Sequence, residues 1–507
     1  MTLEAILAAC PRIATHQPWP CVVVDVEAWQ QAAGLLAAGD LTLLSLWGET
    51  GRIHMALLRT RGQDDAALSD TAPAALMPAV VLLSLDCADN RYPSVGRVHP
   101  PAIRLERAAH DLFGLEAIAT PDERPWLDHG RWGNDAPPAY AFLPVAGENL
   151  HQIPVGPVHA GIIEPGHFRF TADGETVVRL EQRLGYVHKG IDQLLSGAAV
   201  PRALRIAGRT SGDSTVAYAF AFCRAVEAAL DIEVPPRAVA LRGVMAELER
   251  IANHLGDFGA VCNDAAFSIM LAHCAVLREQ VLRCAASCFG HRLMMDRIVP
   301  GGVAADLDAG GTAAIRALVD TLRSRLPPLV TLYDETASLQ DRTAGTGIVR
   351  PELVRRFGAG GHVGRASGRD FDTRRDLAYP PYDALRFTVP VRQDGDVNAR
   401  VWIRIREIEQ SLSMMDQLLQ ALPPGPVRAS VEDTPAGPFE GMALVEAFRG
   451  DVLVWLRVNT GRVERCHLRD ASWFQWPLLE AAIEGNIVAD FPLCNKSFNC
   501  SYSGHDL

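Results

Sequence analysis

The sequence has no apolar run long enough to cross a lipid bilayer. The longest run, around residues 77–85, falls far short of the ~20 residues that a membrane-spanning helix needs. The N-terminal segment has no basic head before its short apolar run and already includes Glu4, so we expect no secretory signal. Basic residues are also scarce: 48 Lys and Arg stand against 60 Asp and Glu, a formal charge of −12. Free nucleic acid is therefore excluded as a partner, because phosphate binding needs a basic surface.

Common metal and nucleotide motifs are missing as well. None of the 11 cysteines forms a C-x-x-C pair, which excludes zinc ribbons and simple iron–sulfur loops. Most cysteines lie in apolar surroundings, which is typical of reduced core cysteines. In the glycine-rich segment 358–364, Val363 stands where the third glycine of G-x-G-x-x-G is needed, and no G-x-x-x-x-G-K-[ST] exists. We expect no familiar nucleotide loop, so any role of NAD would be indirect.

The chain does have length and apolar content. Its 507 residues are 48% hydrophobic and 21% charged, enough for two or more domains with a buried core. Residues 1–135 are predicted to form a small mixed α/β domain, and the Pro-, Gly- and Asn-rich residues 136–156 a linker. Helical and strand-like patterns alternate in the first domain, at 3–9, 21–24, 27–38, 42–46, 54–58 and 79–85.

Helical periodicity dominates residues 157–507, the second predicted domain. A hairpin-like stretch at 167–180 turns at Asp173-Gly174. Long amphipathic helices are predicted over 215–230, 236–259, 266–289, 313–333 and 399–422. Strand-like segments then flank a turn at 459–461, and a last helix at 478–484 precedes a terminal loop. Long helices with apolar stripes favour a bundle, so the fold class is α+β, with a mainly helical second domain and minor β-sheet.

Two groups of polar side chains share a helix face by their spacing. Glu247, Arg250 and His254 lie at i, i+3 and i+7, and form either an interior network between helices or a solvated ion-pair face. Two cysteines and a histidine between 284 and 291 lie at i, i+4 and i+7. They are either metal ligands or, more commonly for such residues, part of a packed helix face.

Several segments resemble subunits of one respiratory superfamily. YPS at 92–94 and ERAAHDLFGL at 106–115 resemble the small peripheral-arm subunit of complex I. GPVHAGIIEPGHFRF at 156–170 and LGYVHKGI at 184–191 resemble the large subunit of energy-converting nickel–iron hydrogenases and the related quinone-site subunit of complex I. The match continues in order with ELERIANHL, RASGRDFDTRRD and LRDASWFQWPLL, at 247–255, 365–376 and 468–479.

This resemblance, including a two-part fusion like the fused C/D subunit of bacterial NADH-quinone oxidoreductases, has consequences for fold and partners. It implies a hydrogenase-large-subunit fold that docks on an iron–sulfur small subunit. Other peripheral-arm subunits and membrane ion-translocating subunits are the further expected partners. The chain itself would then be cytoplasmic and peripheral on the inner face of the cell membrane, held there through its partners.

The hydrogenases of this family hold nickel and iron with two C-x-x-C pairs, because soft thiolates can bridge both metals. The resemblance places the first pair, within R-x-C-G-x-C, on residues 209–214. Both cysteine positions are serine there, Ser211 and Ser214. A hydroxyl stays protonated near neutral pH and cannot replace a bridging thiolate.

The C-terminal pair has two possible registers. It falls on Cys494 and Ser497 or, counted from the closing Asp506, on Ser501 and Gly504. At most one of four sulfurs remains, so no NiFe centre, no metal ligands and no cofactor bound by this chain are expected, and iron–sulfur clusters belong to a partner. The residues assigned to this remnant pocket are Arg209, Ser211, Gly212, Ser214, Cys494, Lys496 and Ser497.

In the complex I relatives, the vacated cavity is the head of a quinone chamber, lined by a loop histidine and a tyrosine. Here His159 matches that histidine, Glu164 is the next polar candidate of the loop, and the tyrosine position falls on Gly212 beside Asp213. His159, Glu164 and Asp213 are the catalytic candidates, as proton relays. The alternatives are solvated loop side chains and, for residues 211–215, caps of the following helix. The only two lysines, Lys189 and Lys496, both lie in motif segments, which suggests a specific ammonium role.

Three functions follow from the resemblance. The first is a metal-free subunit of a membrane-associated oxidoreductase complex, passing electrons from a partner iron–sulfur cluster to a quinone or coupling redox chemistry to ion translocation. The second is a catalytically silent scaffold or coupling subunit. The third, a working NiFe hydrogenase with unconventional ligands, fits the residues least.

Overall fold

The computed structural model describes residues 2–59, 79–130, 132, 140–159, 163–429 and 436–507. The chain divides into two compact units. The first comprises Met1–Phe142, Leu184–Tyr186 and Arg355–Gly358, and the second comprises Leu143–Arg183, Val187–Val354 and Ala359–Leu507. The predicted boundary between residues 135 and 136 lies outside the described residues. No helix among the described residues is long and apolar enough to cross a membrane.

The first unit is built on a four-stranded sheet in the order β2-β5-β4-β3. β2 pairs with β5 in parallel, and the other neighbours are antiparallel. Its strands are β2 (Cys21–Val24), β3 (Leu41–Glu49), β4 (Arg52–Arg59) and β5 (Val80–Asp86). β5 is buried in all but its last residue, as expected of a Val- and Leu-rich strand covered on both faces.

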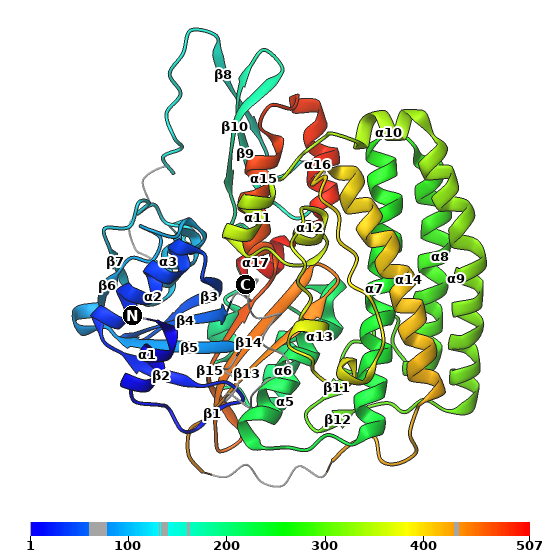
Figure 1. Cartoon of the computed structure of the whole chain (residues 1–507), viewed down its shortest axis with the longest axis horizontal. Coiled ribbons are helices and arrows are strands. Elements are labelled where there is room, and N and C mark those ends of the chain that lie inside the picture. Colours follow the sequence, from blue (N-terminus) through cyan, green and yellow to red (C-terminus); the bar gives the residue numbers. More distant parts are fainter. Residues whose placement is uncertain (1, 60–78, 131, 133–139, 160–162, 430–435) are drawn as a thin grey trace, which may run out of the picture. The chain divides into compact units, whose positions relative to one another are not determined.

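Helices α1 (Leu3–Ala9), α2 (Val26–Ala38) and α3 (Ile103–Phe113) accompany this sheet (Figure 1). Asp25 starts α2 by accepting a hydrogen bond from Ala28 N at 2.8 Å, and Gly39 ends it with φ +87°. The sequence prediction for this region is confirmed, with α1 and β2 at the expected residues. The remaining short elements are β1 (His16–Gln17), η2 (Ala88–Asn90), β6 (Arg91–Pro93), η3 (Pro100–Ala102) and β7 (Glu116–Ile118).

The two motif segments of the first unit meet at Glu106. This buried α3 carboxyl accepts hydrogen bonds from Ser94 Oγ at 2.8 Å and Val95 N at 2.6 Å. Burial raises its pKa to about 7, against the effect of these donors. The YPS and ERAAHDLFGL segments are therefore parts of one local packing arrangement.

The second unit begins with an antiparallel sheet in the order β10-β9-β8. β9 (His167–Asp173) and β10 (Thr176–Arg183) confirm the predicted hairpin and its turn at Gly174. β8 (Leu150–Val155) lies inside the predicted linker 136–156, so that stretch is not wholly a connector. Its six residues pair with β9 in antiparallel register, from Leu150 with Asp173 to Val155 with Phe168, so the strand is defined by this pairing.

Four long helices, α7, α8, α9 and α14, pack side by side as a bundle (Figure 1). They span Pro236–Asp264, Ser268–Phe289, Ala309–Glu335 and Val397–Gln420, each close to its predicted range. α6 (Thr215–Leu230) packs instead against β13 (Phe439–Ala447) and β14 (Gly450–Asn459), which with β15 (Arg462–Arg469) form an antiparallel meander. The predicted α+β fold is confirmed.

The region after β15 corrects the sequence prediction. α15 (Ser472–Ile483) begins six residues earlier than expected, and the supposed terminal loop holds α16 (Phe491–Phe498) and α17 (Tyr502–Asp506). Short polar helices such as α17 lack a periodic apolar signal, so tertiary contacts define them. The other elements are α4 (Ile191–Leu195), α5 (Val200–Ala207), η4 (Gly212–Ser214), β11 (Ile298–Val299), β12 (Gly302–Val303), α10 (Ala337–Thr343), α11 (Pro351–Phe357), α12 (Gly361–Ala366), α13 (Thr373–Asp376), η5 (Tyr382–Ala384) and η6 (Val488–Asp490).

Candidate functional site

The first motif segment ends in η4, directly before α6. Asp213 is its centre: it accepts hydrogen bonds from Ser211 Oγ at 2.6 Å and Ser214 Oγ at 3.2 Å. Arg449 donates to both carboxylate oxygens, at 2.8 and 2.6 Å. Burial opposes ionisation, but the Arg449 pair and the two hydroxyls outweigh it and lower the pKa of Asp213 to about 2. Asp213 is therefore ionised at neutral pH. Its side chain is 35% exposed.

Ser211, Asp213 and Ser214 do not cap α6 through their side chains, so helix capping does not explain why these polar residues lie here. Ser214 makes no side-chain cap bond. Glu249, on α7, does this instead, accepting hydrogen bonds from Val216 N at 2.7 Å and Ala217 N at 3.0 Å. The sequence did not predict this role of Glu249. Glu249 lies on a different face of α7 from Glu247, and its contact with α6 arises only when the two helices pack together.

The C-terminal segment meets the first motif at Ser501. Its hydroxyl donates to Ser211 Oγ at 3.2 Å and accepts from Gly504 N at 2.9 Å. A Cβ at Gly504 would lie 2.8 Å from the Asp470 carboxylate, so that position has no room for a side chain as the site stands. Asp470 in turn accepts from Tyr218 on α6, at 2.9 Å. This geometry favours the register that puts the second motif on Ser501 and Gly504.

Cys494, Lys496 and Ser497 lie on α16 in a different environment. Ser497 Oγ donates to the Cys494 carbonyl at 2.6 Å and accepts from Arg400 Nε at 2.9 Å. Arg400 otherwise donates to two backbone carbonyls, and burial lowers its pKa to about 10. Within the described part of the chain, no hydrogen bond or ion pair joins these three α16 residues to Ser211 or Ser214. Arg209 likewise pairs elsewhere, with Asp296 at 2.7 Å.

The loop candidates approach the same C-terminal segment. Glu164 accepts a hydrogen bond from Ser503 N at 3.1 Å. His159 packs its ring on Phe168 at 5.9 Å, Phe168 on Trp476 at 6.2 Å, and Trp476 on Tyr502 at 4.8 Å. Glu164 thus contacts α17 directly, and His159 reaches it only through aromatic rings. Residues 160–162 of this loop lie outside the described residues.

Residues 187–189 also form hydrogen bonds with Asp506 and Leu507. Val187 N donates to Asp506 Oδ2 at 3.1 Å, His188 Nδ1 lies 2.7 Å from the Asp506 carbonyl, and Lys189 N donates to the Leu507 carbonyl at 2.6 Å. Burial lowers the pKa of the Lys189 ammonium, while Glu164 and Asp506 oppose that shift. The Lys189 region therefore belongs to the same polar neighbourhood as Glu164.

The two helix-face groups have different outcomes. Glu247 and Arg250 pair at 3.2 Å and His254 lies 2.8 Å from Glu407, all fully buried, so this group is the interior network rather than a solvated face. Cys284 Sγ and Cys288 Sγ lie 4.0 Å apart. The neighbouring histidine ring instead accepts from Leu293 N and Met295 N. Throughout the described ranges, no three His, Cys, Asp or Glu side chains are grouped to hold a metal ion.

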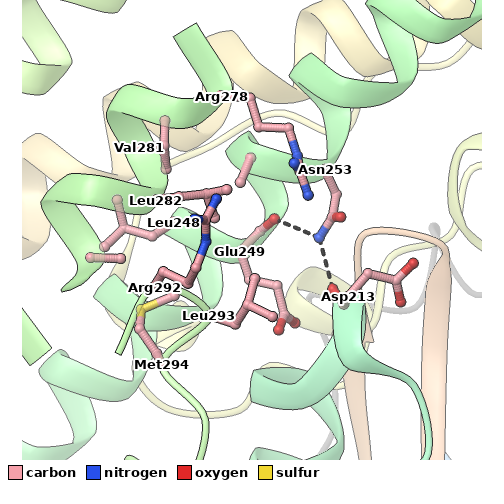
Figure 2. A pocket seen from close by; sticks show the side chains of 12 residues that line it. Asp213, Leu248, Glu249, Asn253, Arg278, Val281, Leu282, Arg292, Leu293 and Met294 are labelled. Carbon is pink, nitrogen blue, oxygen red and sulfur yellow. Dashed lines mark hydrogen bonds between the residues drawn. The ribbon is translucent and has the colours of Figure 1, made fainter. Parts of the chain in front are cut away.

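A small pocket opens beside Asp213, between η4, α7 and α8 (Figure 2). Asn253 donates one hydrogen bond to the Asp213 carbonyl at 2.8 Å and one to the Glu249 carbonyl at 2.9 Å. Arg278, Arg292 and apolar side chains of α8 complete the lining. Burial raises the pKa of Glu249 to about 8, Asp213 adds to this, and the backbone donors oppose it. The pocket is therefore lined by one carboxyl whose pKa is lowered, that of Asp213, and one whose pKa is raised, that of Glu249.

The chain is similar to known proteins over most of its length. Residues 264–442 match the family "Respiratory-chain NADH dehydrogenase, 49 Kd subunit". Formate hydrogenlyase subunit 5 of Escherichia coli is 31% identical over 449 residues, covering 84% of this chain and 79% of that protein. Carbon monoxide-induced hydrogenase of Rhodospirillum rubrum is 32% identical over 354 residues, covering 69% and 98%. An NADH-quinone oxidoreductase subunit of Syntrophobacter fumaroxidans is 32% identical over 353 residues, covering 69% and 94%.

The fold has a counterpart in a solved complex. A chain of the archaeal membrane-bound sulfane sulfur reductase, a respiratory membrane complex, superimposes with a TM-score of 0.67 and 25% identity, covering 71% of this chain and 99% of that one. The fold and the matched regions define a subunit of an oxidoreductase complex. The chain belongs to the family that unites these hydrogenase subunits with the 49-kDa subunit of NADH-quinone oxidoreductase. The resemblance drawn from the motifs is confirmed.

Proposed function

We propose that this chain is a metal-free member of its family, which passes electrons from a partner's iron–sulfur cluster to a quinone or couples redox chemistry to ion translocation. The observation that carries the proposal is the polar cluster of Ser211, Asp213, Arg449 and Ser501. Where the hydrogenase relatives need thiolates, this cluster has hydroxyls that hydrogen-bond one another and an ion pair.

A NiFe centre does not fit these residues. Ser211, Ser214 and Ser501 are hydroxyls that stay protonated, and Gly504 offers no donor atom. Cys500, the nearest thiol in sequence, contacts Gln475 Oε1 at 3.9 Å, and burial raises its pKa beyond the range of a ready thiolate. The expected result for the purified complex is no stoichiometric nickel and no infrared bands from iron-bound carbonyl or cyanide. One nickel per chain with those bands would contradict the proposal.

The quinone role is tested at His159. The His159 ring packs on Phe168, the first of the aromatic rings that lead to α17. A quinone head bound at this loop would accept a hydrogen bond from the His159 imidazole. His159→Ala is expected to slow quinone-dependent electron transfer by on the order of 10²-fold if the imidazole supplies a proton. His151→Ala is the matched control, since that histidine is exposed on β8. Equal rates in the two variants would count against a quinone contact at this loop.

One observation favours the second candidate, a catalytically silent coupling subunit. The ion pair with Arg449 holds Asp213 ionised at neutral pH, so it is a poor proton donor and acts as an anchor between η4 and the β13–β14 turn. In that case His159→Ala leaves electron transfer unchanged, whereas Asp213→Ala impairs assembly of the complex. Quantifying the co-purified subunits of each variant separates the two candidates.

The partners proposed are an iron–sulfur small subunit, further peripheral-arm subunits and membrane ion-translocating subunits. The support is that the relatives are subunits of respiratory complexes, one of them described as a membrane complex. Association with the inner face of the cell membrane would then be indirect, through these partners. Affinity purification of the tagged chain from membranes, followed by identification of its companions, tests this directly.

A further inference from the structure

Glu249 differs from the other carboxylates around it in having no cationic partner among the described side chains. Glu247 pairs with Arg250, Glu407 with Arg365, and Asp213 with Arg449. Glu249 is only 8% exposed, yet it accepts two backbone amides and forms no ion pair with any described Arg, Lys or His side chain. A buried carboxylate without a cation loses most of its hydration energy, so its neutral form is favoured unless other groups compensate.

Glu249 is among the residues that line the small pocket beside Asp213. The pocket's polar lining comes from Asp213, Glu249, Asn253, Arg278 and Arg292, with Arg278 drawn beside Asn253 (Figure 2). The volume open to the centre of a water molecule is about 10 Å³, close to what one ordered water requires. The pocket is therefore sized for water and is too small for an organic ligand.

The charges that face Glu249 come from three elements. Asp213 on η4 disfavours a second negative charge, and Arg250 on the same helix favours it. Arg278 and Arg292 also line the pocket, and Arg292 forms an ion pair with Glu279 at 2.7 Å. Burial exceeds the effect of the two amides, which brings the pKa of the Glu249 carboxyl to about 8. Its protonation therefore changes in the physiological range.

We propose that Glu249 is a proton-exchanging carboxyl that binds and releases one proton through water in this pocket. Its carboxylate takes H⁺ from a hydronium ion in the pocket, leaving water and a neutral carboxyl, and no electron is transferred in the step. Asp213 couples this site to the polar cluster: its negative charge strengthens proton binding at Glu249, and loss of that charge weakens proton binding there. Proton exchange at Glu249 goes beyond the proposed electron transfer and does not depend on it.

The competing role is a purely structural cap of α6. A cap carboxylate would be ionised at neutral pH and would stabilise the helix equally over the neutral range. The two roles therefore differ in pH dependence. Glu249→Gln keeps a neutral side chain at every pH, and Glu249→Asp keeps a titratable one. Glu409→Gln, on α14 and outside the pocket lining, is the control.

The first measurement is infrared difference spectroscopy of the purified complex between about pH 6 and about pH 9.5. The wild type and Glu409→Gln are expected to lose a protonated-carboxyl C=O band with a midpoint at about pH 8. That loss should be absent in Glu249→Gln and should persist, with a shifted midpoint, in Glu249→Asp. The same titrating band in Glu249→Gln, or no such band in the wild type, would overturn the proposal.

The second measurement is thermal unfolding over the same pH range. A carboxyl whose pKa rises from 4.5 to about 8 on folding holds a proton that the unfolded chain releases. Its stabilisation is complete below pH 4.5 and is lost as the pH rises through about 8. The wild-type midpoint should therefore fall relative to that of Glu249→Gln from about pH 6 to about pH 9. A constant difference would mean that Glu249 is only a cap. Should Glu249→Gln fail to fold, Glu249→Asp against the wild type decides by the presence or absence of the titrating band.

Discussion

Two faces of helix α7 carry glutamates two residues apart, with opposite electrostatic outcomes. Burial opposes ionisation of both Glu247 and Glu249. Arg250 and Arg374 nevertheless lower the pKa of Glu247, aided by hydrogen bonds from Ser411 and Tyr382 at 2.6 Å. Glu249 has only backbone donors, and its pKa rises to about 8. Burial alone therefore does not fix the state of a carboxyl; the partners that the fold brings to it do.

We expect the largest effect from a substitution on the face of α7 that carries Glu247, the glutamate that forms ion pairs. Glu247→Gln removes the charge that compensates Arg250 and Arg374 while leaving both guanidinium groups buried. We expect a loss of about 3 kcal/mol in the free energy of unfolding, the lower end for breaking a buried pair, because Arg250 and Arg374 keep Glu407 and Asp372 as partners. Denaturant unfolding measures it, with Glu279→Gln as the exposed control. A loss as small as that of the control would show that the network is not stabilised by ion pairing.

Asp213→Asn is expected to have the next largest effect. It leaves Arg449 buried without its carboxylate, at a cost of about 1–3 kcal/mol, moderated because Asp213 is partly exposed. Because the pKa of Asp213 falls from 3.8 to about 2 on folding, its contribution is present above 3.8 and is lost as the pH falls toward about 2. The difference from the wild type should therefore shrink in acid. The variant should also shift the Glu249 titration to lower pH, since Asp213 raises that pKa.

Asn253→Ala should have a smaller effect on the pocket face. It removes two hydrogen bonds, to the carbonyls of Asp213 and Glu249, for an expected loss of about 1–2 kcal/mol. Asn263→Ala, near the end of the same helix, is the matched control. Thermal unfolding of both variants at one pH gives the comparison, and equal midpoints would mean that the Asn253 bridge adds no stability.

The smallest effect is expected for Glu249→Gln at about pH 6, a change of less than ~1 kcal/mol. The wild-type carboxyl is neutral under those conditions, so the substitution leaves the charge unchanged. The measurement is denaturant unfolding in the same buffer as for Glu247→Gln. If both glutamine variants lost the same free energy, the two faces of α7 would not differ in their electrostatics.

Much of the fold follows from the sequence because its signals are local. The 3.6-residue periodicity places α6 at its observed residues and α7, α8 and α14 within a few, and the turn residues place the β9–β10 hairpin. α17 and the β13–β14 turn at Arg449 were not predicted. These two segments are too short or too polar to show a hydrophobic periodicity, and contacts with distant segments stabilise them.

The candidate site was predictable in part for the same reason. Ser211 and Ser214, which the resemblance aligns with cysteines of the hydrogenase relatives, are hydroxyl residues, and their identity can be read from the sequence. The choice between Cys494 and Ser501 as the partner segment was not, because both follow similar local patterns. Only the approach of Ser501 to Ser211, 290 residues apart in sequence, distinguishes them.

By itself, the sequence determined the family, the α+β class and the chemical nature of the side chains that the resemblance aligns with the hydrogenase cysteines, since these depend on residue order alone. The tertiary structure decided which charge meets which. It gave Arg449 to Asp213, Arg250 and Arg374 to Glu247, and, among the side chains that the structure describes, no paired cation to Glu249. The reason is that Coulomb interactions and desolvation depend on distance and burial in space, which residues far apart in the chain establish only on folding.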